Sequence, residues 1–163
     1  MAFRLKSCFG DDEPGLLKDF SEALARFSMK RANAYLCAHN GKEFDFPYIA
    51  RRMLINGMKL PDSLNVPGKK PWETPFLDTM ELWRFGDYKN YTSLNLLSHV
   101  FGIPSPKDDI DGSQVAKVYW RDKDLPRIVR YCEKDVLAIA QLMLRYKNLD
   151  LIEPENVSSG TKF

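Results

Sequence analysis

Two aspartates in this chain stand in settings that could support chemistry. Asp45 ends the segment 39–45 (HNGKEFD), which follows a short apolar run and opens a helix. Asp135 lies inside a longer helical pattern, one turn after Tyr131, so the two side chains project from the same helical face. A carboxylate can hold a divalent cation, and a neighbouring phenol can hold an attacking water by a hydrogen bond. The pattern is typical of a metal-dependent site that cuts phosphodiester bonds.

Each position also has a purely structural interpretation. Asp45 precedes Phe46-Pro47 and could be a helix N-cap, and Tyr131 could be packed at a helix edge beside a solvated Asp135. The setting of Asp45 favours chemistry, because ligand sites in α/β sheets form outside the carboxyl ends of strands. Beside it, Asn40 can form hydrogen bonds and Phe44 can stack on a base or wedge under a terminal nucleotide.

The elements that must position these residues alternate between strands and helices. Strands are expected over 3–7, 34–38 and 74–80, the second as an apolar run covered on both faces. Helices are expected from the acidic 11–14 segment to about 28, from about 46 to 55, from 93 to 101 and from about 125 to 146, with long loops over 59–72 and 104–112. The order predicts an α/β fold with one domain over 1–151 and a flexible tail over 152–163.

Composition bounds the class of protein. The chain has 163 residues, of which 44% are hydrophobic and 28% charged, as in an ordinary globular domain. The net charge of +2 is too balanced to indicate nucleic-acid binding by itself. The three cysteines form no CxxC pair, so we expect buried, reduced thiols. No apolar run is of membrane-spanning length and no signal-peptide pattern opens the chain, so we expect a cytoplasmic protein without a membrane partner.

Taken in order, the motifs resemble those of the DEDD superfamily of 3′–5′ exonucleases, in the subtype with a tyrosine in its last motif. Asn40-x-x-x-Phe44-Asp45 resembles the second motif, and Tyr131-x-x-x-Asp135 resembles the third. More closely, residues 3–146 are similar to the stand-alone exonucleases related to the proofreading domain of family-B DNA polymerases. The likeness also runs through 76–83, 91–94 and 106–113.

This resemblance implies a ribonuclease H-like fold and two-metal hydrolysis of single-stranded DNA from its 3′ end, with RNA left open as a substrate. It implies that Asp135 binds a metal directly, that Asp45 helps to hold the other, and that Tyr131 orients the nucleophile. Mg²⁺ or Mn²⁺ fits, because the ligands are hard carboxylate oxygens.

Basic and aromatic residues could line a path for the strand, since lysines meet phosphates and aromatic rings stack on bases. An equal alternative is that Trp72 and Phe85 belong to the core and that the lysines form a solvated surface. The candidates for substrate binding are Asn40, Phe44, Lys69, Lys70, Phe85, Lys89, Tyr91 and Ser93.

The family's first motif, an Asp-x-Glu on the first central strand, has no counterpart upstream of Phe3. The segment 3–8 matches the family's third strand, so we expect an N-terminally truncated fold that lacks the first two strands. Asp11-x-Glu13 has the right spacing but is typical of helix-capping acids in a loop. With only Asp45 and Asp135, two metals would carry too much uncompensated charge, so we expect the chain to be inactive or nearly so.

A missing central strand would leave backbone groups unpaired. Either segment 3–8 pairs with 34–38, or a second copy covers the exposed sheet edge in a homodimer. Two other functions stay open: an inactive homologue that binds nucleic acid, and a structural or interaction module that does not. Met1 could be a natural start, a mistaken gene start or a fragment boundary.

Overall fold

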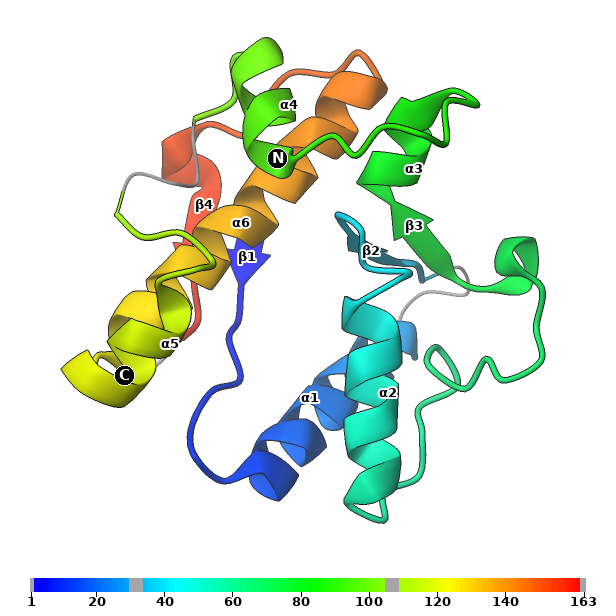
Figure 1. Cartoon of the computed structure of the whole chain (residues 1–163), viewed down its shortest axis with the longest axis vertical. Helices are drawn as coiled ribbons and strands as arrows, with labels where there is room; N and C mark the ends of the chain where they lie inside the picture. The colour runs from blue at the N-terminus through cyan, green and yellow to red at the C-terminus, as the bar shows by residue number, and fades with distance from the viewer. Residues whose placement is uncertain (1, 30–33, 105–108, 162–163) are drawn as a thin grey trace. The chain divides into compact units, whose positions relative to one another are not determined.

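The computed structural model describes residues 2–29, 34–104 and 109–161. It contains two compact units, and each is described by itself. The first, the 10–85 unit, spans Gly10–Phe85, and the second, the terminal unit, joins Met1–Phe9 to Gly86–Phe163. Helices and small parallel sheets occur in both, which is compatible with the expected α/β class (Figure 1). The single domain expected over 1–151 stays a prediction.

The 10–85 unit is built on a parallel strand pair joined through a helix. Strand β2 pairs with β3 in the register Leu36↔Phe76 and Ala38↔Asp78, and helix α2 lies between them in the chain. The elements of this unit are α1 (Glu13–Ser28), β2 (Leu36–Ala38), α2 (Asp45–Ile55), η1 (Pro71–Glu73), β3 (Phe76–Asp78) and α3 (Thr79–Arg84). The helices expected from 11–14 to about 28 and from about 46 to 55 are confirmed, with Glu13 and Asp45 as their first residues.

The core of this unit lies between α1, α2 and one face of the sheet. Its buried members are Leu17, Phe46, Met53 and Leu64. The Phe46 ring stacks on Phe76 of β3 with the ring centroids 4.3 Å apart, which joins the first turn of α2 to the sheet. Burial of large apolar side chains on this face is the main force that holds the helices against the strands.

The other face of β2 is not covered as expected. Because side chains alternate along a strand, Leu36 and Ala38 pack against the core while Tyr35 and Cys37 are exposed. The prediction of a strand covered on both faces is therefore wrong. The segment 3–8 also does not pair with β2, since β1 pairs with β4 instead.

The terminal unit centres on one long helix, α6 (Leu125–Tyr146), drawn in orange in Figure 1. Asp124 caps it by accepting a hydrogen bond from the Arg127 backbone N–H. Its bounds are those that the apolar spacing predicted. Cys132 and Val136 are exposed, however, so they do not belong to the buried stripe expected on this helix, and the expectation of buried thiols is wrong for Cys132 and Cys37.

The other elements of the terminal unit are short. Helix α4 begins where it was expected, because the Ser93 hydroxyl accepts a hydrogen bond from the Leu96 N–H and caps its first turn. The elements are β1 (Phe3–Leu5), α4 (Leu94–Val100), α5 (Val115–Lys117), η2 (Val118–Asp122), η3 (Pro154–Asn156) and β4 (Val157–Ser159). Part of the loop expected over 104–112, residues 105–108, lies outside the described residues.

The segment expected to be a flexible tail forms a strand instead. β4 pairs in parallel with β1, in the register Phe3↔Val157. Ahead of it, the Gln141 side chain accepts from the Ile152 N–H at 2.8 Å and donates to the Ile152 carbonyl at 2.9 Å. The tail prediction failed because these partners are distant in the sequence and leave no local pattern.

A carboxylate on α6 holds the same segment. Glu133 Oε1 accepts hydrogen bonds from three hydroxyl groups, those of Ser7, Ser159 and Thr161. Desolvation tends to raise the pKa of Glu133, but these donors outweigh it and the pKa is lowered. Helix α6, the segment that follows β1, and residues 159 and 161 are thereby joined through one charged group. No described helix is long and apolar enough to cross a bilayer.

Candidate functional site

The loop that presents Asp45 is a tight turn after β2. Asn40 adopts a left-handed conformation with φ of 61°, and the Phe46 N–H reaches back to the Gly41 carbonyl at 3.0 Å. A Cβ at Gly41 would lie 2.3 Å from the Ala38 Cβ, closer than two carbons can approach. The turn therefore requires glycine at position 41.

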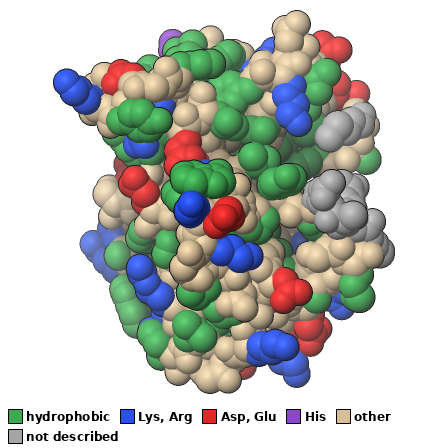
Figure 2. Space-filling view, turned by 90° about the vertical axis from the view of Figure 1, so that its right-hand side faces the viewer, with side chains coloured by type: hydrophobic (Ala, Val, Ile, Leu, Met, Phe, Trp, Pro, Cys, Tyr) green, Lys and Arg blue, Asp and Glu red, His purple; other side chains and the backbone are tan. Residues whose placement is uncertain are grey.

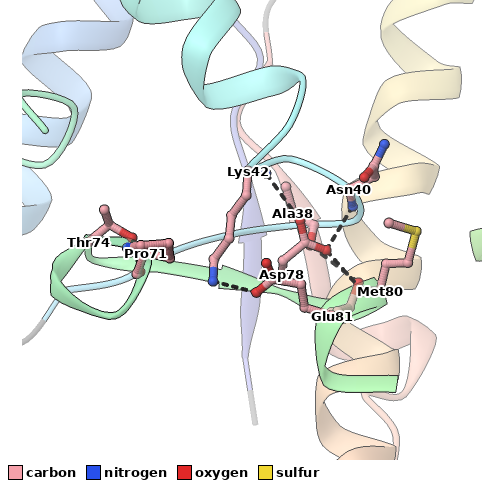
Figure 3. A network of polar contacts seen from close by, with 9 residues as sticks. Ala38, Asn40, Lys42, Pro71, Thr74, Asp78, Met80 and Glu81 are labelled. Atoms are coloured by element: carbon pink, nitrogen blue, oxygen red, sulfur yellow. Dashed lines mark hydrogen bonds and ion pairs between the residues drawn. The ribbon is translucent and has the colours of Figure 1, made fainter. Parts of the chain in front are cut away.

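Asp78 holds this loop from the neighbouring strand (Figure 3). One carboxylate oxygen accepts from the Asn40 N–H at 2.9 Å and the Met80 N–H at 3.0 Å, and the other accepts from the Lys42 N–H at 3.1 Å. The Asp78 side chain is buried, at 3% exposure, and the Lys42 ammonium also pairs with Glu81 at 2.5 Å. One carboxylate thus ends β3, caps α3 and fixes the turn before Asp45.

The strand expected over 74–80 is accordingly shorter, because the Asp78 cap starts a helix at Thr79. Thr79 is fully buried, and its hydroxyl donates to the Ala38 carbonyl at 3.3 Å and bonds the His39 ring at 2.9 Å. Sequence reasoning missed the role of Asp78. Its signal was an aspartate between an apolar run and Thr79-Met80-Glu81, which is typical of an N-cap.

Asp45 itself does not act as a helix cap. It is the first residue of α2, Phe44 occupies the cap position, and no side-chain cap bond is formed there. The Asp45 side chain is exposed to solvent. Partial desolvation is the largest cause that raises its pKa, and the charge of Asp78 raises this pKa further. A hydrogen bond from the backbone N–H of Asp45 itself partly offsets both effects. Phe44 is 65% exposed and its ring stacks on Tyr48 at 5.9 Å.

Tyr131 and Asp135 meet on one face of α6, as their spacing predicted. The tyrosine hydroxyl donates a hydrogen bond to the Asp135 carboxylate. Desolvation, then the charge of Asp135, raise the pKa of Tyr131 to about 12, so the phenol stays protonated at neutral pH. A Cβ added at Gly112 would lie 4.0 Å from this hydroxyl, at an ordinary van der Waals distance.

The carboxylate oxygens of the two motifs are the type of ligand that a hard divalent cation prefers, but they are too few to make a complete site. Asp45 belongs to the 10–85 unit and Asp135 to the terminal unit, and each offers carboxylate oxygens, which Mg²⁺ and Mn²⁺ prefer. Within the described ranges, no group of three or more His, Cys, Asp or Glu side chains could hold a metal. Asp78 already accepts three backbone N–H groups, so its oxygens are committed to the fold.

Glu13, the glutamate of the Asp11-x-Glu13 pair, is also used structurally. Its two oxygens accept from the Arg52 guanidinium at 2.6 and 2.5 Å, and Asn56 donates to one of them at 3.1 Å. The side-chain hydrogen bond from Arg52 is the largest cause that lowers the pKa of Glu13 to about 2. This ion pair joins α1 to α2, so Glu13 is not a ready metal ligand.

Comparison with known protein families identifies the lineage. A family model described as predicted 3′–5′ exonucleases related to the exonuclease domain of PolB matches residues 4–156. The chain belongs to this family. The match contains both motifs, 40–45 and 131–135, and a family of exonucleases acts on nucleic acid. Searches of curated proteins and of solved structures found no significant match.

For a member of this exonuclease family, exposed aromatic and basic side chains are natural contacts for a strand. Phe85 is 89% exposed and Trp72 is 76% exposed, so the alternative that they belong to the core is wrong. The Lys70 ammonium lies 5.3 Å from the Trp72 ring centroid. The candidates Lys69, Lys70, Lys89 and Tyr91 are exposed as well. Figure 2 shows hydrophobic side chains exposed among lysine and arginine side chains on one face.

Ser93 and Tyr88 are two further candidates for contact with the substrate. The Ser93 hydroxyl is engaged as the cap of α4, so a role in substrate binding would compete with that bond. Tyr88, which sequence reasoning missed, is 79% exposed in the same segment as Phe85, Lys89 and Tyr91. Its signal was the density of aromatic residues between 83 and 91.

A pocket of about 460 Å³ opens elsewhere, between the end of α1 and residues 59–63. It is lined by Leu24, Met29, Leu60 and polar neighbours, and it contains none of the candidate site residues. The pocket is therefore separate from the residues that the motifs single out.

Proposed function

We propose that this chain comes from a lineage of 3′–5′ exonucleases that have a ribonuclease H-like fold and remove nucleotides from the 3′ end of single-stranded DNA, and that these 163 residues alone have little or no activity. The family match over residues 4–156 carries this proposal. It is supported by the Tyr131–Asp135 pair on α6 and by the loop that presents Asp45 beside the exposed Phe44 ring. Asn40 and Phe44 would contact the terminal nucleotide.

In this proposal, Asp45 and Asp135 help to hold two divalent cations, Mg²⁺ or Mn²⁺. Such ions activate water and stabilise the leaving oxygen in phosphodiester hydrolysis. Tyr131 orients the attacking water through its hydroxyl, which carries its proton at neutral pH. Partial desolvation and the charge of Asp78 raise the pKa of Asp45, and a bound cation would act against both effects by stabilising the ionised carboxylate.

The proposal also includes weak metal binding by these 163 residues alone. Two carboxylates balance only half of the charge of two divalent cations, and tight sites usually supply more oxygen ligands. We therefore expect little or no turnover of a 5′-labelled single strand in Mn²⁺. Turnover that Asp135→Ala abolishes would overturn this expectation and at the same time establish the exonuclease activity.

A shared centre can be tested without turnover. Mn²⁺ broadens the NMR signals of nuclei near its site, so titration should broaden amide signals around both Asp45 and Asp135 at the same concentrations. Asp135→Asn should weaken the broadening at both positions. A matched control is Asp150→Asn, because Asp150 is an exposed aspartate just beyond α6. Broadening around only one of the two aspartates would contradict the proposal that they share one metal centre.

A second function, binding of nucleic acid without cleavage, is favoured by the exposed Phe85, Trp72 and Lys70 side chains. Affinity for single strands in a chelator, with no cleavage of DNA or RNA in Mg²⁺ or Mn²⁺, would support it over the nuclease. Comparison of DNA with RNA oligonucleotides of one sequence tests the proposed preference for DNA. A chain without affinity for either at low salt would instead be an interaction module.

We also propose that a second copy covers the exposed edge of the β2–β3 sheet in a homodimer. The proposal is supported by the exposed side chains of Cys37 in β2 and of Tyr35 just before it. Light scattering at increasing concentration tests it. A mass that stays at 18.8 kDa would rule the homodimer out.

A further inference from the structure

An irregular helical turn ahead of α6 presents a tryptophan to solvent. Helix α5 continues into a π-helical turn, η2, which ends at Lys123 in a left-handed conformation with φ of 54°. The Lys123 and Asp124 N–H groups both donate to the Val118 carbonyl, and the Val118 side chain is 2% exposed. The turn is therefore anchored on its inner side. π-Helical turns are rare in proteins, and those that occur are often found at functional sites.

The outer side of this turn carries an ordered aromatic pair. Trp120 is 69% exposed, although an indole is among the costliest side chains to leave in water. The Tyr119 ring meets it edge to face, with centroids 4.7 Å apart and an interplanar angle of 88°. The Lys123 ammonium lies 5.4 Å from the Trp120 ring centroid. The indole is thus held in place without being buried.

Cations flank this aromatic pair. Lys117, Arg121 and Lys123 are exposed, against a single exposed carboxylate, Asp122, in the same seven-residue stretch. Among the residues described by the structure, none of these three cations forms a salt bridge. A surface with an exposed indole and a local excess of positive charge fits a chain of phosphates that carries unpaired bases.

We propose that Trp120 and Tyr119 form a stacking platform for an unpaired base of single-stranded nucleic acid, with Lys117, Arg121 and Lys123 on the flanking phosphates. Asp135 lies about 15 Å along α6 from the first residue of that helix. The platform therefore takes a nucleotide upstream of the one to be cleaved and acts as a second contact for the same strand. This inference rests on the proposed function for the nature of its ligand.

Binding of a 5′-fluorescein oligothymidylate, measured by anisotropy at low salt in EDTA, tests the platform without turnover. Trp120→Leu keeps an apolar side chain but removes the ring, and we expect its Kd to rise about 10-fold. Trp120→Phe keeps a stacking surface and should recover most of the affinity. Arg121→Gln should reduce the slope of log K against log salt by about 0.7, the value for one phosphate on a single strand.

Lys147→Gln is the matched control, because Lys147 is an exposed cation at the opposite end of the 22-residue α6. It should leave both the Kd and its salt dependence close to those of the wild type. Equal affinity of Trp120→Leu and the wild type would overturn the platform but leave the exonuclease proposal standing. A wild-type chain with no measurable binding at low salt would overturn both.

Discussion

Asp45 and Asp135 differ in the contacts that hold their carboxylates in place. Asp135 stands on α6, where hydrogen bonds within the helix and the neighbouring Tyr131 set its position. Asp45 follows a loop whose backbone is held by Asp78, through bonds that span 38 and 36 residues of the chain. Local contacts thus position the Asp135 carboxylate, and long-range contacts position the Asp45 carboxylate. A substitution at Asp78, which is far from Asp45 in the sequence, should therefore disturb the loop that presents Asp45.

The largest expected effect breaks the long-range arrangement at its centre. Asp78→Ala leaves three backbone N–H groups without their acceptor in a buried place, and we expect a loss of about 3 kcal/mol in the free energy of unfolding. Amide hydrogen exchange should rise at Asn40 and Lys42. Urea unfolding and exchange by NMR measure the two effects.

Asp87→Asn is the control for Asp78→Ala, since Asp87 accepts from the Lys89 N–H and the Asn90 side chain in an exposed turn. We expect a change within about 0.5 kcal/mol for this variant. An Asp78→Ala chain as stable as Asp87→Asn, with unchanged exchange at Asn40, would show that the loop does not depend on Asp78.

The second prediction compares the stability cost of an alanine at two glycines, one in the loop before Asp45 and one near Tyr131. Gly41→Ala forces a Cβ against Ala38 and should cost about 2 kcal/mol, because the end of β2 must move. Gly112→Ala, beside the Tyr131 hydroxyl, meets nothing closer than 4.0 Å and should be neutral within about 0.5 kcal/mol. Thermal unfolding of both variants measures the contrast. Equal costs at the two positions would remove the claim that the Asp45 loop is the tighter one.

The local coupling on α6 predicts a titration. Tyr131, observed by ¹³C-tyrosine NMR, should ionise with a pKa of about 12. Asp135→Asn removes a negative charge and should lower that pKa, although desolvation keeps it above the ordinary value. Tyr146 is the internal control, because desolvation alone raises its pKa to about 12 and the substitution should not move it. A Tyr131 pKa indifferent to Asp135→Asn would contradict the coupling.

The smallest effect concerns the charge on Asp45. Because its pKa is raised in the folded chain, its contribution to stability is fully present below the unfolded pKa and is lost as pH rises through the folded pKa. Asp45→Asn should therefore stabilise the chain at pH 7, by well under 1 kcal/mol because solvent screens the exposed side. Urea unfolding at pH 7 and pH 3 should show this gain only at pH 7. A destabilised variant at pH 7 would reverse the sign that we infer.

Prediction from the sequence succeeded where a pattern repeats within a few residues. Helix α6 was found with its bounds because its apolar side chains recur at helical spacing. It failed for β4, whose Val157–Ser159 segment is short and rich in serine, like a tail. The exposure of Cys37 was missed because an apolar run looks the same whether one face of its strand is covered or both.

The amino-acid sequence by itself determined the exonuclease lineage, the helix with its Tyr131–Asp135 pair, and the place of Asp45 at the start of α2. These features depend on spacing within one or two helical turns, where backbone geometry dictates which side chains meet. Only the tertiary structure showed that Asp78 fixes the Asp45 loop, that Glu133 holds the end of the chain, and that Trp120 is exposed. Those facts arise from groups brought together by folding, and no local pattern encodes such meetings.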